Sequence, residues 1–271
     1  MTNTVRKYLM LLLMFPLQLI GQGEECRFIK KTIKDTVYYG IGSNSVSPIS
    51  IIISPVNEDV TGMSYKKEFV IKSNDSIEGA IRIHSNVADT LPLDKIVKQF
   101  DIKLFYGDKK HSKHNADYLY TLPFKKGKRY EVTQGFYGKR SHNSIASRYA
   151  IDFNLKIGEL VCAAREGVVV YTIDHFKEAG GKAFTYKANK ILIMHDDGTF
   201  ASYAHLNYKG VLVKKGDYVK SGQPIGYSGN TGNSRGPHLH FVVREADDVS
   251  VPVYFKGYKD KTLKRGKRYK R

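Results

Sequence analysis

The sequence has only two cysteines among its 271 residues, Cys26 and Cys162. Two cysteines with this spacing do not make a cysteine-based metal site. They could pair in an oxidising compartment. Cys162, however, lies in the apolar run Leu160-Val161-Cys162-Ala163-Ala164, which is typical of a buried strand. We therefore expect Cys162 to be a packed free thiol.

The apolar run from Tyr8 to Ile20 is too short for a membrane-spanning helix, which needs ~20 residues. Arg6 and Lys7 precede this run, and Gly21-Gln22-Gly23 supplies small residues at the two positions that a signal peptidase reads. The pattern predicts a signal peptide over residues 1–23 and an exported protein, found in the periplasm, in the cell envelope or outside the cell. An uncleaved membrane anchor is the alternative.

Acidic residues are scarce, with 26 Asp and Glu against 44 Lys and Arg, for a formal charge of +18. Loss of the signal peptide removes two bases and no acid, which lowers the charge to +16. Such an excess favours polyanionic surroundings. Residues 256–271 carry nine Lys and Arg against the single acid Asp260. We expect this basic tail to be a disordered, solvated arm that supports at most non-specific adhesion to anionic cell-wall polymers. A motif for specific nucleic-acid binding is missing.

Residues 24–115 contain short β-rich runs that are separated by turn residues. These runs include Ile49–Ile53, Glu68–Lys72, Ala80–His84 and Phe100–Tyr106. Short strands with regular turn signals predict a small, β-sandwich-like module. The module contains no group of chemically reactive side chains. A pro-region, a wall-targeting domain and an interaction domain all remain open as its role.

Residues 116–255 are also strand-like and have no convincing long amphipathic helix. Strands are expected at Tyr149–Leu155, Val168–Ile173, Lys190–His195 and Phe200–Leu206. Asp196-Asp197-Gly198 separates the last two, and its Asp-Gly dipeptide is a strong hairpin signal. We therefore predict a mainly β protein, with the N-terminal module followed by an antiparallel β domain.

Two histidines lie one residue apart in the segment Gly236-Pro237-His238-Leu239-His240-Phe241. Alternate residues of a strand share a face, so His238 and His240 would point to one side while Leu239 and Phe241 enter the core. Paired imidazoles can hold a metal or transfer protons beside one. A bare His-x-His is more often a solvated strand face, so other ligands are needed.

Three more candidates occur in polar or strand-rich segments of the same domain: His142, Asp152 and His205. Asp152 lies in an apolar strand, where a carboxylate is costly to bury unless it is paired or metal-bound. A catalytic zinc ion takes three protein ligands and leaves one position for water. Five candidates match three ligands and two proton-transferring groups. Their spacing does not identify which three would bind the metal.

The order of these motifs resembles the lysostaphin/LytM-type zinc endopeptidases, which cut peptide bonds in bacterial peptidoglycan. The resemblance covers roughly Tyr130 to Phe255 and rests on four ordered motifs. Their residues are His142 with Tyr149-Ala150-Ile151-Asp152-Phe153, then Gly158–Val169, Tyr203-Ala204-His205-Leu206, and Gly229-Asn230-Thr231-Gly232 with the His-x-His segment.

This resemblance implies one Zn²⁺ per chain with His142, Asp152 and His240 as ligands. It implies that His205 and His238 are the catalytic pair, and that the substrate is a peptidoglycan peptide. The family's commonest first motif has three residues between its His and Asp, whereas nine separate His142 from Asp152. We therefore expect His142 to lie on a looped-out segment.

A catalytically silent relative that binds the wall or a regulatory partner is the main alternative. Such relatives typically lack ligands, and the presence of all five positions favours the enzyme. A lipoyl-type carrier is a further alternative, because the segment from Val211 to Gly226 resembles its hairpins. That segment lacks a Met-Lys-Met tip, and a carrier needs no histidine group.

Overall fold

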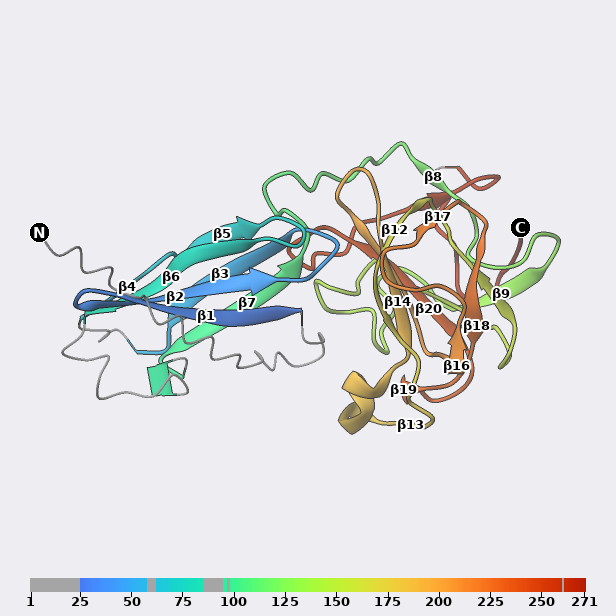
Figure 1. Cartoon of the computed structure of the whole chain (residues 1–271). Helices are drawn as coiled ribbons and strands as arrows, with labels where there is room; N and C mark the ends of the chain where they lie inside the picture. Colours follow the sequence, from blue (N-terminus) through green and yellow to red (C-terminus); the bar gives the residue numbers. More distant parts are fainter. Residues whose placement is uncertain (1–24, 58–61, 85–94, 97, 260) are drawn as a thin grey trace, which may run out of the picture. The chain divides into compact units, whose positions relative to one another are not determined.

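The computed structural model describes residues 25–57, 62–84, 95–96, 98–259 and 261–271. The chain divides into two compact units, Met1–Leu104 and Phe105–Arg271 (Figure 1). The predicted signal peptide, residues 1–23, lies outside the described residues and stays a prediction. Within the described residues, no helix is both long and apolar enough to span a membrane.

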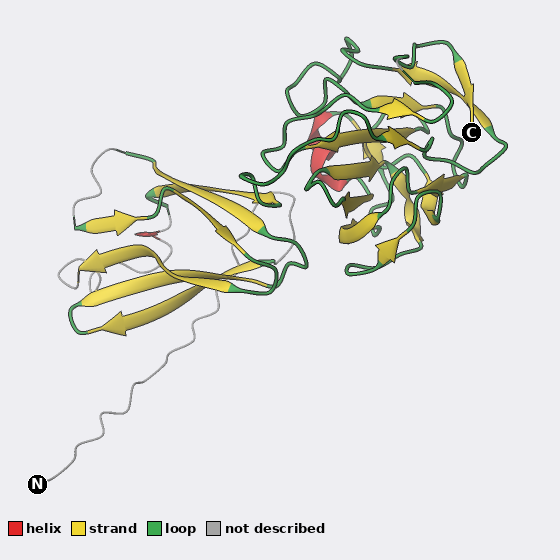
Figure 2. Cartoon of the chain, turned by 90° about the horizontal axis from the view of Figure 1, so that it is seen from above, coloured by secondary structure: helices red, strands yellow, loops and turns green. Residues whose placement is uncertain are grey.

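The first unit is built from two sheets, visible as separate groups of strands in Figure 2. One sheet has the order β1-β2-β6-β4, and the other has the order β5-β3-β7. Their strands are β1 (Cys26–Ile33), β2 (Thr36–Ser43), β3 (Ile49–Pro55), β4 (Met63–Tyr65), β5 (Glu68–Ile71), β6 (Ser76–His84) and β7 (Phe100–Tyr106), whose last two residues belong to the second unit. Tyr65 of the first sheet packs edge-on against Phe100 of the second, with ring centroids 5.2 Å apart.

The second unit is organised around an eight-stranded sheet with the order β17-β12-β14-β15-β20-β10-β9-β22. In chain order its strands are β9 (Arg129–Gln134), β10 (Ile151–Phe153), β12 (Gly167–Ile173), β14 (Lys190–Met194), β15 (Phe200–Ala204), β17 (Tyr218–Val219), β20 (Leu239–Arg244) and β22 (Arg268–Lys270). All recorded pairings within this sheet are antiparallel.

Smaller sheets complete the second unit. The sheet β11-β18-β16 is antiparallel, whereas the pairs β13–β19 and β8–β21 are parallel. These strands are β8 (Leu119–Tyr120), β11 (Leu160–Cys162), β13 (Ala179–Gly180), β16 (Leu206–Val211), β18 (Pro224–Ser228), β19 (Gly232–Asn233) and β21 (Tyr254–Phe255), and a short 3-10 helix covers Lys182–Lys187.

The mainly β prediction is confirmed. The Asp-Gly hairpin forms as expected, because β14 and β15 pair antiparallel up to Met194 and Phe200. Leu239 and Phe241 are buried with 0% and 1% exposure, as the alternation of β20 predicts. They join a core cluster of the second unit, whose burial removes apolar surface from water and stabilises the sheet.

Both cysteines are buried free thiols. The expectation that Cys162 is a packed thiol is therefore confirmed. Burial raises the pKa of the Cys26 thiol to about 11 and also raises that of Cys162. Both thiols therefore stay protonated near neutral pH, which keeps their nucleophilicity low.

The expectation of a disordered C-terminal arm is wrong. Strand β22 pairs with β9, so the end of the chain extends the main sheet. Leu263 is 3% exposed and belongs to the core cluster, against which Tyr269 also packs. Packing of Leu263 and Tyr269, together with the pairing of β22 with β9, thus orders the C-terminal segment even though Lys and Arg dominate its composition.

Candidate metal centre

Strands β10 and β20 bring Asp152 and His240 directly opposite each other in antiparallel register. Side chains of such pairs lie on the same face with Cβ atoms ~4.5–5.5 Å apart. His240 Nδ1 lies 2.8 Å from Asp152 Oδ1. On its other side, β20 places His240 opposite Ala204, the last residue of β15. The register of three strands therefore positions the carboxylate, one imidazole and the residue that precedes His205.

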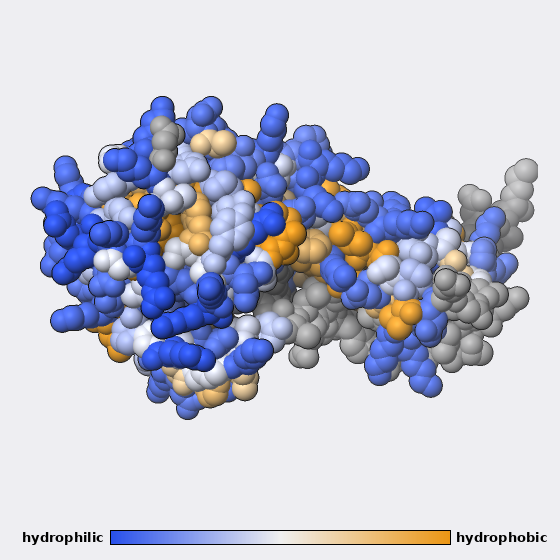
Figure 3. Space-filling model, turned by 180° about the vertical axis from the view of Figure 1, so that it is seen from behind, coloured by the Kyte–Doolittle hydropathy of each residue, from blue (hydrophilic) through white to orange (hydrophobic). Residues whose placement is uncertain are grey.

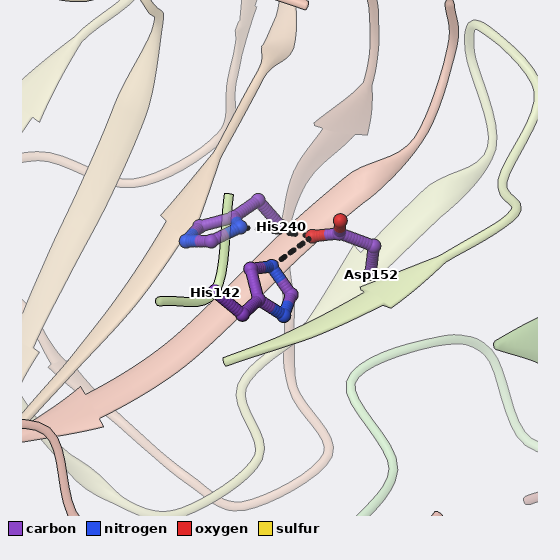
Figure 4. A group of neighbouring side chains, drawn as sticks. All are labelled: His142, Asp152 and His240. Carbon is purple, nitrogen blue, oxygen red and sulfur yellow. Dashed lines mark hydrogen bonds and ion pairs between the residues drawn. The ribbon is translucent and has the colours of Figure 1, made fainter. Parts of the chain in front are cut away.

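His142 reaches the same carboxylate from a stretch of turns between β9 and β10. Its side chain is fully buried, and its Nε2 lies 3.2 Å from Asp152 Oδ1 (Figure 4). His142 Nδ1 donates a hydrogen bond to the carbonyl oxygen of Gly135, 2.9 Å away. That bond fixes the tautomer and directs Nε2 toward Asp152. The expected looped-out position of His142 agrees with this arrangement.

The three donor atoms suit a zinc ion. One donor atom from each of His142, Asp152 and His240 lies within 4.8 Å of the other two. His142 Nε2 and His240 Nδ1 lie 3.2 Å and 2.8 Å from Asp152 Oδ1. Ligands at ~2.0–2.1 Å from a tetrahedral zinc ion lie roughly 3.4 Å apart. Small shifts would bring these atoms to that spacing. Two imidazoles and one carboxylate are also a donor set that zinc prefers.

Gln134 holds the second oxygen of Asp152, a role that the sequence did not reveal. Its Nε2 donates to Asp152 Oδ2 at 3.1 Å and to Ser141 Oγ at 2.7 Å, and its Oε1 accepts from the amide of Arg140 at 3.0 Å. Gln134 thus joins the carboxylate to the turns that carry His142. Partners of this kind orient metal ligands in other proteins.

The charges of the centre are mutually stabilised. Burial alone would raise the pKa of Asp152, but the hydrogen bonds and positive charge that His142 and His240 provide when protonated outweigh it and hold this pKa well below its usual range. Burial lowers the pKa of His142, yet the bond and charge of Asp152 more than compensate, and the net shift is upward. For His240 burial dominates, and its pKa is lowered. The carboxylate is therefore ionised and available to a cation.

His205 and His238 lie beside these three residues without joining them as donors. Their ring centroids are 4.6 Å apart, and that of His205 is 5.8 Å from that of His240. His205 Nδ1 donates to the carbonyl of Thr231 at 2.7 Å, and His238 Nδ1 donates to that of Gly236 at 2.8 Å. In the neutral state both rings therefore carry their proton on Nδ1, and His238 Nε2 lies 3.9 Å from Asp152 Oδ1.

The backbone of His205 adopts a left-handed conformation with φ of 63°. Non-glycine residues in this region carry strain, which is often found at functional sites. Burial, followed by the neighbouring His238 and His240, lowers the pKa of His205 to about 3. His205 is thus a neutral imidazole near pH 7. The structure brings together all five residues that the sequence singled out.

A known protein family matches part of the second unit. The pattern of peptidase family M23 matches residues 146–252. A peptidoglycan DD-endopeptidase of Vibrio cholerae, ShyA, is 36% identical over 116 residues, which are 42% of this chain and 24% of ShyA. Lysostaphin of Staphylococcus simulans is 43% identical over 94 residues, 34% of this chain and 17% of the relative.

The second unit contains a peptidase M23 domain. Among solved structures, the catalytic domain of lysostaphin from Staphylococcus simulans shares 30% identity, with a TM-score of 0.31, over 52% of this chain and 95% of that domain. The aligned part of the chain spans a quarter or less of the length of ShyA and lysostaphin.

The residues matched by family M23 include only part of the metal centre. Asp152, His205, His238 and His240 lie inside the matched residues, whereas His142 and Gln134 precede them. The C-terminal segment from Thr262 to Arg271 follows them. The family match therefore accounts for the strand residues of the centre, and the segment that carries His142 lies outside it.

Proposed function

We propose that this protein is a zinc-dependent endopeptidase that hydrolyses peptide cross-links of bacterial peptidoglycan. The observation that carries the proposal is the convergence of His142, Asp152 and His240 on one point, with two further imidazoles beside it. The M23 match and the names of the relatives, a peptidoglycan endopeptidase and lysostaphin, support the substrate class. Export through residues 1–23 would bring the enzyme to the cell wall.

In this proposal His142 Nε2, Asp152 Oδ1 and His240 Nδ1 hold the metal. Bound zinc supplies Lewis-acid chemistry, which polarises a peptide carbonyl and eases the deprotonation of water. Gln134 and the carbonyl of Gly135 keep the donor atoms aimed at the ion. A prearranged donor set reduces the reorganisation needed when the metal binds.

His205 and His238 are the proton-transferring pair in this proposal. Their Nδ1 protons are held by the carbonyls of Thr231 and Gly236, so each Nε2 can accept a proton. One imidazole takes the proton of the attacking water as the new C–O bond forms. A proton is then delivered to the leaving amine as the C–N bond breaks. The protonated imidazole also stabilises negative charge on the carbonyl oxygen.

The decisive experiment compares His205→Ala with His240→Ala. His205→Ala should retain zinc while cleavage of cross-linked muropeptides falls by ~10²–10⁴-fold, the usual contribution of a general acid or base. His240→Ala should lose both zinc and activity, because two remaining ligands hold zinc poorly. Zinc content and muropeptide turnover are measured in parallel on both variants and on the parent.

Two results would contradict the proposal. If His205→Ala released zinc while His240→Ala retained it, His205 would be the zinc ligand and His240 the proton-transferring group. A zinc-loaded parent that cuts nothing across a panel of cross-linked muropeptides would favour the alternative of a silent wall-binding or regulatory protein.

A further inference from the structure

A groove of about 550 Å³ lies between the turns that follow β9 and the C-terminal segment. One wall is formed by residues 133–140 and the other by residues 262–265. Both walls lie outside the residues matched by family M23. The groove is therefore made by segments that flank the matched residues on either side, and its volume falls within the ~300–1,000 Å³ typical of ligand sites.

The charge of the groove has one sign. Lys139, Arg140, Lys264 and Arg265 line it, and no acidic residue does. All four are exposed, and none forms an ion pair within the part of the chain that the structure describes. Unpaired like charges that converge on one groove repel each other, and an anionic ligand would relieve that repulsion.

The walls of the groove are fixed. Gly266 N donates to Val132 O at 2.8 Å, and Val132 N donates to Lys267 O at 2.9 Å. A Cβ atom on Gly135 would lie 2.7 Å from the carbonyl oxygen of Leu263, so only glycine allows the walls to approach this closely. The cations are thus presented by a preformed surface, which lowers the entropy cost of binding.

The groove adjoins the metal centre through two residues. Gln134 lines the groove and donates to Asp152 Oδ2, and Gly135 lines it and accepts the bond from His142 Nδ1. Tyr137 adds an exposed aromatic side chain whose hydroxyl donates to that of Tyr149 at 2.7 Å. A substrate that reaches the centre has its neighbouring segments within reach of this groove.

On the face of the molecule drawn in Figure 3, hydrophilic side chains predominate, and apolar side chains form only small groups. In the groove itself the charged lining residues are all basic, which suits an electrostatic contact with an anionic ligand. The proposed substrate carries carboxylates on its peptide stems, and an extended peptide of four residues measures roughly 13–14 Å. Its charge is complementary to that of the groove.

We infer that the groove between residues 133–140 and 262–265 is a binding site for a carboxylate-bearing peptide of the cell wall. This inference rests on the proposed function, because it names the part of the substrate that the domain's flanking segments recognise. The folded C-terminal segment then supplies a defined half of a binding site through Lys264 and Arg265.

The test measures binding of a short peptide without cleavage. The probe is a fluorescein-labelled, uncross-linked stem tetrapeptide with free carboxylates, followed by fluorescence anisotropy. The same peptide with amidated carboxylates and inorganic polyphosphate serve as comparison ligands. The double variant Lys264→Gln/Arg265→Gln removes two groove cations. The matched control Lys110→Gln/Lys113→Gln removes the same charge from an exposed loop of the same unit.

We expect the groove variant to bind the free peptide about fivefold more weakly than the parent, the loss expected for two partly exposed ion pairs. The control should change affinity by less than about twofold, because distant exposed charges are screened. The amidated peptide should bind weakly to all three proteins. Equal losses in both variants, or equal binding of both peptides, would reject the inference. Tighter, groove-dependent binding of polyphosphate would reject the carboxylate peptide in favour of a phosphate-bearing polyanion.

The outcomes separate this inference from the proposed function. Cleavage of a cross-linked muropeptide is measured on the same preparations. A parent that binds the tetrapeptide through Lys264 and Arg265 but cuts no cross-link would reject the proposed function alone. A parent that cuts cross-links and shows no groove-dependent binding would reject the groove alone.

Discussion

Asp152 and His240 reach the metal centre from paired strands, whereas His142 reaches it from a stretch of turns. The strand residues are fixed by backbone register, in which Asp152 stands opposite His240 and His240 stands opposite Ala204. Such a register cannot slip without turning every side chain of the strand to the other face. The strand half of the centre is thus fixed by the fold of the sheet.

The loop half depends on individual contacts. His142 is held by the carbonyl of Gly135, and Gln134 holds the neighbouring backbone at Arg140. Farther along the loop, Arg244 Nε donates to Ala146 O at 2.6 Å and Ser250 Oγ donates to Ile145 O at 2.8 Å. The pairing of strands therefore positions Asp152 and His240, whereas a few side-chain and backbone hydrogen bonds position His142.

The largest effect is expected from removing the loop ligand itself. His142→Ala should lower zinc affinity by more than the ~10–100-fold that loss of an outer partner costs, because a direct donor is lost. Affinity is measured by competition with a metal chelator. The control is His111→Ala, whose imidazole is largely exposed and pairs with Asp108. Unchanged zinc affinity in His142→Ala would show that the strand residues bind the ion without the loop.

A smaller effect is expected when the C-terminal segment loses its buried anchor. Leu263 is 3% exposed, so Leu263→Ala should lower the free energy of unfolding of the second unit by ~2–5 kcal/mol. The matched control is Leu212→Ala, since Leu212 is 50% exposed and its loss should cost within ~0.5 kcal/mol. Urea unfolding monitors both variants. Equal stability of the two variants would mean that the segment does not pack in solution.

The strands and the hairpin could be predicted because their signals are local. The Asp-Gly turn after Lys190–His195 and the alternation around His238 and His240 each specify structure within a few residues. The fold of the C-terminal segment could not be predicted in this way. Its nine bases dominate the composition, and burial of Leu263 depends on pairing between β22 and β9, which are more than 130 residues apart.

The residues of the metal centre were predictable from the sequence to different degrees. The pattern of residues pointed to five candidates, but only the family resemblance divided them into ligands and proton-transferring groups. Gln134 was missed because a lone glutamine carries no chemical signal, and its partner Asp152 is 18 residues away in the sequence. Its one sequence signal was its place at the end of a strand, just before the turns that carry His142.

The smallest effect is expected from Gln134→Ala, which tests whether the position of His142 depends on the hydrogen bonds of Gln134. This variant keeps all three donor atoms but removes the bonds to Asp152 Oδ2, Ser141 Oγ and the amide of Arg140. Zinc affinity should fall by ~10–100-fold, the usual cost of losing a partner that orients a ligand. Gln223→Ala is the matched control, because Gln223 accepts from the amide of Lys220 in a remote turn at 3.0 Å. If the loop half depends on such contacts, only Gln134→Ala should weaken zinc binding, and it should do so even where both variants unfold at the same urea concentration. Parallel weakening in both variants would instead reflect a general loss of stability, and no weakening in either would mean that His142 is held as firmly as the strand ligands.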